Sequence, residues 1–189
     1  MKTEMSRRAP ELRRDAVIDA ARELFIQHGQ SATSVDAIAK RAGVAKGTVY
    51  LYFSSKEHII EAIETQFNAQ VLDRVQSAAR SFAGAGTDAI TAWCVELTHA
   101  YLDLLDTHDM LFLGRAASRE ADDPLVDDLA ALLAAQGHLA PVSTAAFLLG
   151  GTTLVIDRAI ATGDTQREQL LQTLRPLVQA VIDGRAVIS

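Results

Sequence analysis

The stretch SVDAIAKRAGVAKGTVYLYF, residues 34–53, decides the fold of the first part of the chain. Ser34 is a good N-cap for a short helix, because apolar residues follow it at three- and four-residue steps up to Ala42. Gly43 permits a tight turn, and a second short helix over residues 45–53 buries Val49 and Phe53. A helix-turn-helix has these dimensions. The outer face of its second helix would present Lys46, Gly47, Thr48, Tyr50 and Tyr52.

The residue types on that outer face suit double-stranded DNA. Lys46 offers a cation to phosphate, and Gly47 lets the backbone approach the groove closely. Thr48 can offer its hydroxyl or methyl group to a base edge, while Tyr50 and Tyr52 can hydrogen-bond phosphate oxygens. Short helix–glycine–helix units are also common in all-α proteins that bind no DNA. The spacing alone therefore leaves a purely structural interpretation open.

The distribution of charge favours the nucleic-acid interpretation for one part of the chain only. The protein has 189 residues and a formal charge of −6, which taken whole argues against a nucleic-acid partner. Residues 1–60, however, carry ten basic and seven acidic side chains, a local charge of +3. The remaining residues carry eight basic and seventeen acidic side chains, a charge of −9. This asymmetry indicates a basic module joined to an acidic one.

Helical periodicity continues on both sides of the helix-turn-helix, without a convincing alternating stretch for a strand. Upstream, Pro10 suits the first position of a helix that Gly29 ends. Downstream, Ser54 and Glu57 form a capping-box pattern that opens a helix to about residue 82. Further helices are predicted over residues 87–106, 109–118 and 124–135, the last capped by Asp123.

Two more helices complete the predicted chain. One covers residues 141–162 and ends at Gly163; the last is capped by Thr165, and Pro176 should bend or divide it. The sequence thus predicts an all-α protein of about nine helices. Residues 1–55 would form a three-helix helix-turn-helix DNA-binding domain, and residues 56–189 a second α-helical domain.

Residues 33–57 closely resemble the DNA-binding signature of the tetracycline-repressor (TetR) family of bacterial transcription regulators. Residues 20–25 and Gly29 resemble the first helix of that family, so the resemblance covers roughly residues 10–60. Two positions depart from it: Ala45 stands where many members have serine or threonine, and Tyr52 where histidine is frequent. The resemblance implies a cytoplasmic, ligand-responsive regulator and not an enzyme. It would be a repressor that binds a palindromic operator as a homodimer and is released by a small-molecule effector.

The resemblance also assigns roles by position. Ser34 and Lys56 would contact phosphates from helix N-termini, where backbone N–H groups favour anions. Lys46, Gly47 and Thr48 would face the major groove, with Tyr50 and Tyr52 on the flanking backbone. Four arginines near the N-terminus would either reach the DNA or lie on a solvated first turn: Arg7, Arg8, Arg13 and Arg14.

For the second module, residues 56–189, the resemblance implies a ligand-sensing and dimerisation domain whose last two helices pair with their copies. The sequence supports this with two strongly apolar stripes and a pair of glycines that permits close approach. Burial of these side chains within one subunit is the alternative. The predicted interface residues are Phe147, Gly150, Gly151, Leu154, Leu170, Leu174, Val178 and Val181.

The effector site has a weaker signal, carried by large apolar side chains and one arginine, which are residue types found more often at ordinary core or surface positions than in a ligand site: Trp93, Tyr101, Phe112, Arg115 and Phe147. His99 and Asp103 have a metal-capable spacing but lack a third ligand, so neither a metal nor a cofactor is predicted. Residues 139–156 form a charge-free run of 18 residues whose Pro141, Gly150 and Gly151 suit a buried helix better than a membrane span.

Two functions from other classes remain as alternatives. One is a small all-α enzyme that uses His99, Asp103, Asp106 and His108, although the chain has no nucleophile motif and no phosphate loop. The other is an interaction module with a non-functional helix-turn-helix. DNA affinity separates both from the regulator.

Overall fold

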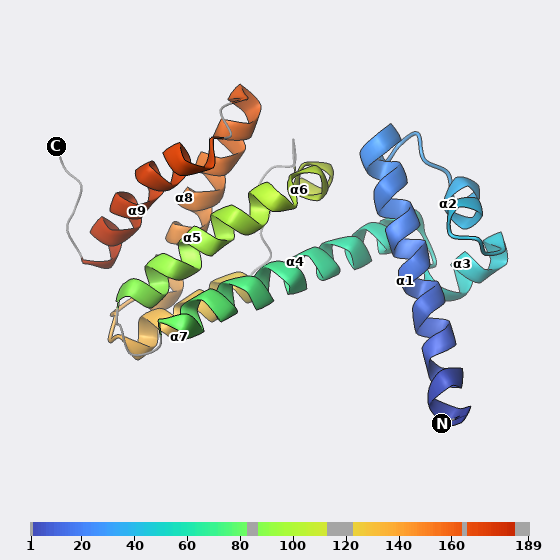
Figure 1. Ribbon diagram of the computed structural model, residues 1–189, viewed down its shortest axis with the longest axis horizontal. Coiled ribbons are helices and arrows are strands. Elements are labelled where there is room, and N and C mark those ends of the chain that lie inside the picture. The colour runs from blue at the N-terminus through green and yellow to red at the C-terminus, as the bar shows by residue number, and fades with distance from the viewer. Residues whose placement is uncertain (1, 83–86, 113–122, 164–165, 184–189) are drawn as a thin grey trace. The chain divides into compact units, whose positions relative to one another are not determined.

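The computed structural model describes the backbone of residues 2–82, 87–112, 123–163 and 166–183, and the side chains of these residues except 2–9 and 87. Its described residues form nine α-helices and no strand. They are α1 (Lys2–His28), α2 (Val35–Arg41), α3 (Lys46–Tyr52), α4 (Lys56–Ser81), α5 (Thr87–Asp103), α6 (Leu105–Phe112), α7 (Pro124–Ala135), α8 (Pro141–Thr162) and α9 (Arg167–Ile182). The all-α prediction is confirmed (Figure 1).

The chain divides into two compact units, Met1–Phe67 with Asp106–Leu113, and Asn68–Leu105 with Gly114–Ser189. The predicted boundary after residue 55 therefore needs correction, because α4 begins in the first unit and ends in the second. Ile59, Ile63 and Phe67 are buried at four-residue steps along α4. The Phe67 ring lies 5.7 Å from the Phe112 ring of α6. The first turns of α4 thus belong to the core of the first unit.

In the first unit, α2 and α3 pack against each other and both contact α1 (Figure 1). The turn between α2 and α3 uses Gly43 at φ +68°, a left-handed conformation that favours glycine. Gly29 ends α1 in the same way, at φ +81°. Ile38 of α2 and Val49 of α3 have no exposed surface, so the two short helices are held by burial of their inner faces.

The structure corrects the predicted starts of α1, α4 and α9. α1 begins at Lys2 and continues through Pro10, because Pro10 forgoes a single backbone hydrogen bond near the helix start and its neighbours are good helix formers. At α4 the hydroxyl that accepts a first-turn N–H belongs to Ser55, 3.4 Å from His58 N, and not to Ser54. Gln166 is the N-cap of α9, and its side chain makes no capping hydrogen bond. Thr165 lies outside the described residues.

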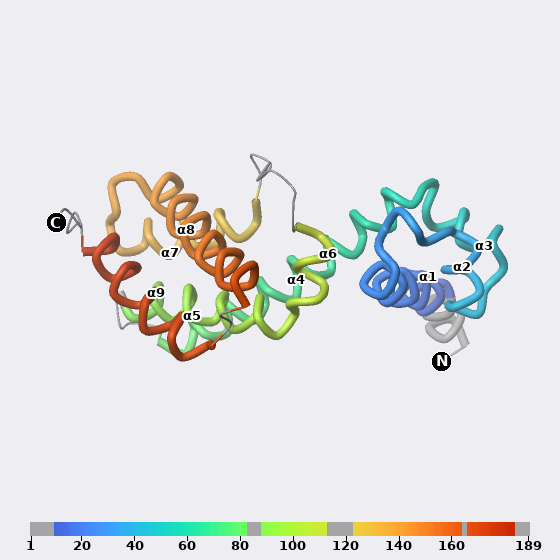
Figure 2. The backbone as a smooth tube through the Cα atoms, turned by 90° about the horizontal axis from the view of Figure 1, so that it is seen from above, coloured from blue at the N-terminus to red at the C-terminus, as the bar shows by residue number. Residues whose placement is uncertain are grey.

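In the second unit, α5 packs against α7, α8 and α9, and α8 also contacts α7 and α9 (Figure 2). α7 and α8 have the predicted bounds, and the Asp123 carboxylate caps α7 by accepting the Leu125 N–H at 2.9 Å. α9 continues through Pro176, so this proline does not divide it. By length and composition alone α8 could cross a membrane, as can core helices of soluble proteins.

The helix predicted over residues 87–106 ends at Asp103, and α6 starts at Leu105 instead of Asp109. No glycine or proline marks this break. Asp103 is held in ion pairs within the second unit, whereas His108 and Leu111 of α6 are buried. The position of the break therefore follows from tertiary contacts that local propensity does not encode.

Candidate nucleic-acid interface

The candidate interface is the outer face of α3. Its seven residues are placed by one buried side chain, Val49, together with backbone hydrogen bonds from Thr48 N to Ala45 O at 2.9 Å and from Phe53 N to Val49 O at 2.9 Å. Burial of Val49 turns the opposite side of the helix to solvent. Lys46, Gly47 and Tyr50 are exposed there, while Thr48 and Tyr52 are half-buried at its edge. The structure thus brings all five predicted α3 residues onto one short helix.

Lys46 stands at the first position of α3 and forms an ion pair across the turn. Its Nζ lies 3.0 Å from Oδ1 of Asp36 in the first turn of α2. The hydrogen bond with Asp36 raises the pKa of Lys46, so the ammonium group stays charged at neutral pH. Both side chains are more than half exposed. A phosphate that approaches Lys46 therefore competes with a carboxylate that already holds it.

Ser34 and Lys56 occupy two further helix starts and both have internal partners. The Ser34 Oγ accepts the Ala37 N–H at 3.1 Å, which caps α2 and leaves the hydroxyl hydrogen to be donated. The Lys56 Nζ donates to the Gln30 carbonyl at 2.6 Å and lies 3.4 Å from the Thr33 carbonyl. Lys56 therefore holds the loop between α1 and α2 in place through these backbone carbonyls, and a contact with phosphate would be an additional role.

That loop has a second anchor within the first unit. The Gln30 Nε2 donates to the backbone carbonyl of Met110 in α6 at 2.8 Å. The buried Thr33 hydroxyl donates to the Gly29 carbonyl at 2.9 Å. Because one residue, Gln30, contacts Lys56 through its carbonyl and α6 through its side chain, the starts of α2 and α4 are tied to α6. Sequence patterns gave no sign of this connection.

The N-terminal arginines are described only in part. The guanidinium of Arg14 lies over the Phe53 ring, 5.4 Å from its centre, and so contributes to the packing of the first unit. Arg13 is exposed on α1. The side chains of Arg7 and Arg8 lie outside the described residues, so the prediction that they reach DNA stays a prediction.

The residues predicted to line an effector pocket do not share one environment. Trp93 is fully buried, and its Nε1–H donates to Asp128 Oδ2 of α7 at 2.8 Å, so its polar group is already satisfied. Tyr101 is also buried in α5. Phe112 belongs to the first unit and packs on Phe67. Phe147 is 66% exposed on α8, so its assignment to a pocket is corrected; Arg115 lies outside the described residues.

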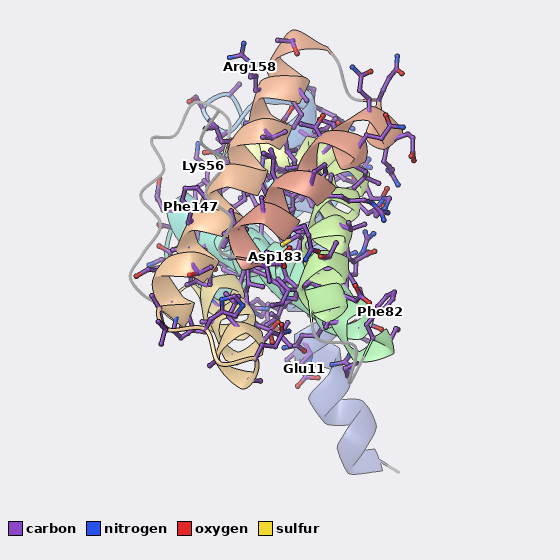
Figure 3. The ribbon with its side chains drawn as sticks, turned by 90° about the vertical axis from the view of Figure 1, so that its left-hand side faces the viewer. Glu11, Lys56, Phe82, Phe147, Arg158 and Asp183 are labelled. Carbon is purple, nitrogen blue, oxygen red and sulfur yellow. The ribbon has the colours of Figure 1, made fainter. Side chains whose placement is uncertain are left out.

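The predicted interface residues of α8 and α9 also differ in their exposure. Phe147 and Leu154 are exposed along α8, with Gly151 between them; Figure 3 labels Phe147 and, farther along the same helix, Arg158. Gly150 and Val181 are half-buried. Leu170, Leu174 and Val178 are buried within the chain itself, because this stripe of α9 packs on α5 and α8. Their assignment to an intersubunit interface is therefore corrected.

Three of the four residues of the alternative enzyme, His99, Asp103 and His108, are engaged in other contacts. The Asp103 carboxylate binds Arg74 at 2.9 Å and Arg167 at 2.5 Å, and the Arg167 guanidinium lies 3.3 Å from His99 Nδ1. His108 packs against the rings of Phe67 and Phe112 in the first unit. Within the described parts of the chain, no group of three His, Cys, Asp or Glu side chains could hold a metal ion.

One exposed residue of α3 was missed in the sequence. Leu51 is 82% exposed, more than any other apolar side chain of that helix. Its position two residues after Val49 places it opposite the buried side of a helix. Helical geometry could have located it, but attention to polar residue types alone passed it over.

Comparisons with known proteins agree with this geometry. Residues 17–63 match the model of the tetR family of bacterial regulatory proteins. The fatty acid metabolism regulator protein of Bacillus subtilis is 42% identical over 60 residues, which are 32% of this chain and 31% of that protein. The regulator UidR of Escherichia coli is 39% identical over 61 residues, 32% of this chain and 31% of that protein. The matched segments thus span about a third of the length of these relatives.

Solved structures resemble nearly the whole chain in fold. The structure of FadR from Bacillus halodurans has a TM-score of 0.71 at 21% identity, over 92% of this chain and 96% of that one. A TetR-family transcriptional regulator from Streptomyces coelicolor has a TM-score of 0.71 at 19% identity, over 95% and 99%. At these identities the likeness concerns fold alone. Residues 17–63 thus match the tetR family of bacterial regulatory proteins, and the chain as a whole has the fold of these solved structures.

Proposed function

We propose that this protein is a cytoplasmic transcription repressor that binds a palindromic DNA operator as a homodimer and is released by a small-molecule effector. The observation that carries the proposal is the outer face of α3. There, one buried residue turns a lysine, a glycine and a tyrosine to solvent on a helix of the width that a major groove admits. The local charge of +3 over residues 1–60 supports attraction to phosphate.

Dimerisation is supported by the exposed apolar side of α8. Phe147 and Leu154 lie seven residues apart, 66% and 69% exposed, and so share one face of the helix. A Cβ atom added at Gly150 or Gly151 would meet nothing within 4 Å, so packing inside the chain does not require these glycines. Glycine inside a helix costs about 0.5–1 kcal/mol relative to alanine. Close approach of a second copy of the chain would explain why α8 has glycines at these positions despite this cost.

The effector is proposed as a small molecule without a more specific identity. The curated relative from Bacillus subtilis is named for fatty acid metabolism, and one solved structure of similar fold is a SmeT–triclosan complex. Both names mention largely apolar compounds, and Trp93 and Tyr101 belong to the buried apolar core of the second unit. A relative's ligand is nevertheless specific to its own pocket.

Selection of DNA from a random pool, together with DNA that flanks the gene, tests the proposal. We expect recovery of a palindrome whose half-sites lie about 34–36 Å apart or a multiple of this distance. Lys46→Ala should lower the slope of log affinity against log salt by about 1 for each lost phosphate contact. Arg175→Ala removes the same charge from the exposed side of α9 and should leave the slope unchanged. Failure to enrich any sequence would refute the proposed function.

A further inference from the structure

Leu51 occupies the middle of the outer face of α3. With about 100° between successive helical residues, Gly47 and Leu51 lie about 160° and 200° from the buried Val49. They are therefore the two residues that face most directly away from the core. Lys46 and Tyr50 flank them on one side of the helix, and Thr48 and Tyr52 on the other. An apolar centre thus stands among polar edges.

Packing inside the protein requires neither central residue. The Leu51 side chain is 82% exposed, so its apolar surface stays in water. A Cβ atom added at Gly47 would meet nothing within 4 Å, and the Gly47 backbone is an ordinary right-handed helix that alanine would stabilise. A single exposed leucine is common on protein surfaces. Here, however, it stands one turn from a glycine that the fold does not need, within the surface proposed to meet DNA.

The chemistry of leucine limits what it can recognise in DNA. Its side chain has no hydrogen-bond donor or acceptor, so it cannot distinguish the polar groups of base edges. In the major groove the apolar group on a base edge is the C5-methyl of thymine. A helix reaches that methyl group only when its backbone approaches the groove closely, and the missing side chain at Gly47 permits such an approach.

We propose that Leu51 is a specificity-determining residue that contacts the C5-methyl group of a thymine in each operator half-site, next to the position where Gly47 meets the groove. The proposal rests on the proposed DNA-binding function. It assigns base preference to an apolar contact at the centre of α3, in addition to the polar contacts of Thr48, and the partner surface is double-stranded DNA.

The test replaces thymine by uracil, one position at a time, in the selected operator. Uracil keeps the O4 acceptor that thymine shows in the major groove and lacks only the methyl group. Removal of one buried methyl group should weaken binding of the unchanged protein about fourfold at one position of a half-site. Leu51→Ala should bind the thymine and uracil operators equally, whereas Leu51→Met keeps an apolar side chain and should retain the discrimination.

Two controls separate loss of this contact from other failures. Because Leu51 is exposed and uncharged, Leu51→Ala should leave the thermal midpoint and the salt dependence of binding unchanged. Failure to select any operator would overturn the function itself. Specific binding that uracil weakens nowhere, or weakens equally in the Leu51→Ala variant, would overturn only the role of Leu51. A changed salt slope in that variant would do the same, because it would indicate altered docking.

Discussion

Lys46 and Asp36 face each other across the turn of the helix-turn-helix, with the ammonium nitrogen 3.0 Å from a carboxylate oxygen. The cation that sequence reasoning assigned to a phosphate is thus paired with an acid in the free protein. Binding to DNA must either break this pair or bring phosphate beside it. Asp36 consequently lowers the affinity of α3 for any DNA, operator or not.

Replacement of Asp36 by asparagine should therefore strengthen DNA binding. Loss of the carboxylate frees Lys46 and removes a negative charge from the approach of phosphate, so we expect an increase of about threefold to tenfold at low salt that shrinks at high salt. Glu11→Gln removes the same charge from an exposed position of α1 and should have a smaller effect. Equal effects of the two variants would show that only net charge matters. Gel shifts at several salt concentrations measure both.

Gly47→Ala should separate stability from binding. No atom of the free protein lies within 4 Å of the added Cβ. The variant should therefore unfold at the same or a higher temperature, because the higher helix propensity of alanine adds up to about 1 kcal/mol to the free energy of unfolding. Operator binding should weaken because the methyl group holds α3 away from the groove. Thermal melts and gel shifts on one preparation measure both quantities. Unchanged operator affinity would show that α3 does not approach DNA at Gly47.

Phe147→Glu should convert the proposed dimer to a monomer. A carboxylate in the centre of the exposed α8 face would lie between two subunits and lose its hydration. Phe82→Glu changes a second exposed phenylalanine, at the end of α4, and should leave the dimer intact. Light scattering after size-exclusion chromatography measures the mass of each variant. A monomeric unchanged protein, or a dimeric Phe147→Glu variant, would contradict an interface at this face.

Cys94 should react with thiol reagents only after unfolding. Burial raises the pKa of this thiol to about 12, so at pH 8 the folded protein holds almost no thiolate. The unfolded chain ionises near the ordinary value of 9.0. The thiol therefore stabilises the fold fully below that pH, and this contribution is lost as pH rises toward 12. Reaction with a chromogenic disulfide, with and without urea, checks the accessibility, and Cys94→Ala should weaken the alkaline loss.

Asp103→Asn should destabilise the second unit by up to about 1 kcal/mol, a modest effect because the carboxylate is 41% exposed. Hydrogen bonds from Arg167 and Arg74 lower the pKa of Asp103. Its contribution is thus fully present above the ordinary pKa of an aspartate and is lost as pH falls through the lowered pKa of the folded protein. Urea melts at pH 7 and pH 3 measure this. The difference between variant and unchanged protein should be smaller at pH 3 than at pH 7; a constant difference would rule out the ion pairs as its cause.

The local sequence correctly predicted most of the helix ends that depend on a single capping or terminating residue. Gly43 and Gly163 have the left-handed backbone that their positions predicted, and the Asp123 and Ser34 caps form as expected. The break at Leu104 was not predicted, because contacts distant in sequence set it, and the shift of the α4 cap by one residue, to Ser55, was not predicted either. The Leu170, Leu174 and Val178 stripe was recognised as apolar, but its partner was assigned to the wrong molecule.

The sequence by itself determined the all-α class, the helix-turn-helix and the residue types on its outer face, since periodicity, glycines and caps act within a few residues along the chain. Only the tertiary structure decided which of those side chains are available to a partner. Asp36 holds Lys46, backbone carbonyls hold Lys56, and Leu51 stands exposed at the centre of α3. Availability depends on burial and charge pairing between segments, and the order of residues does not specify those contacts directly.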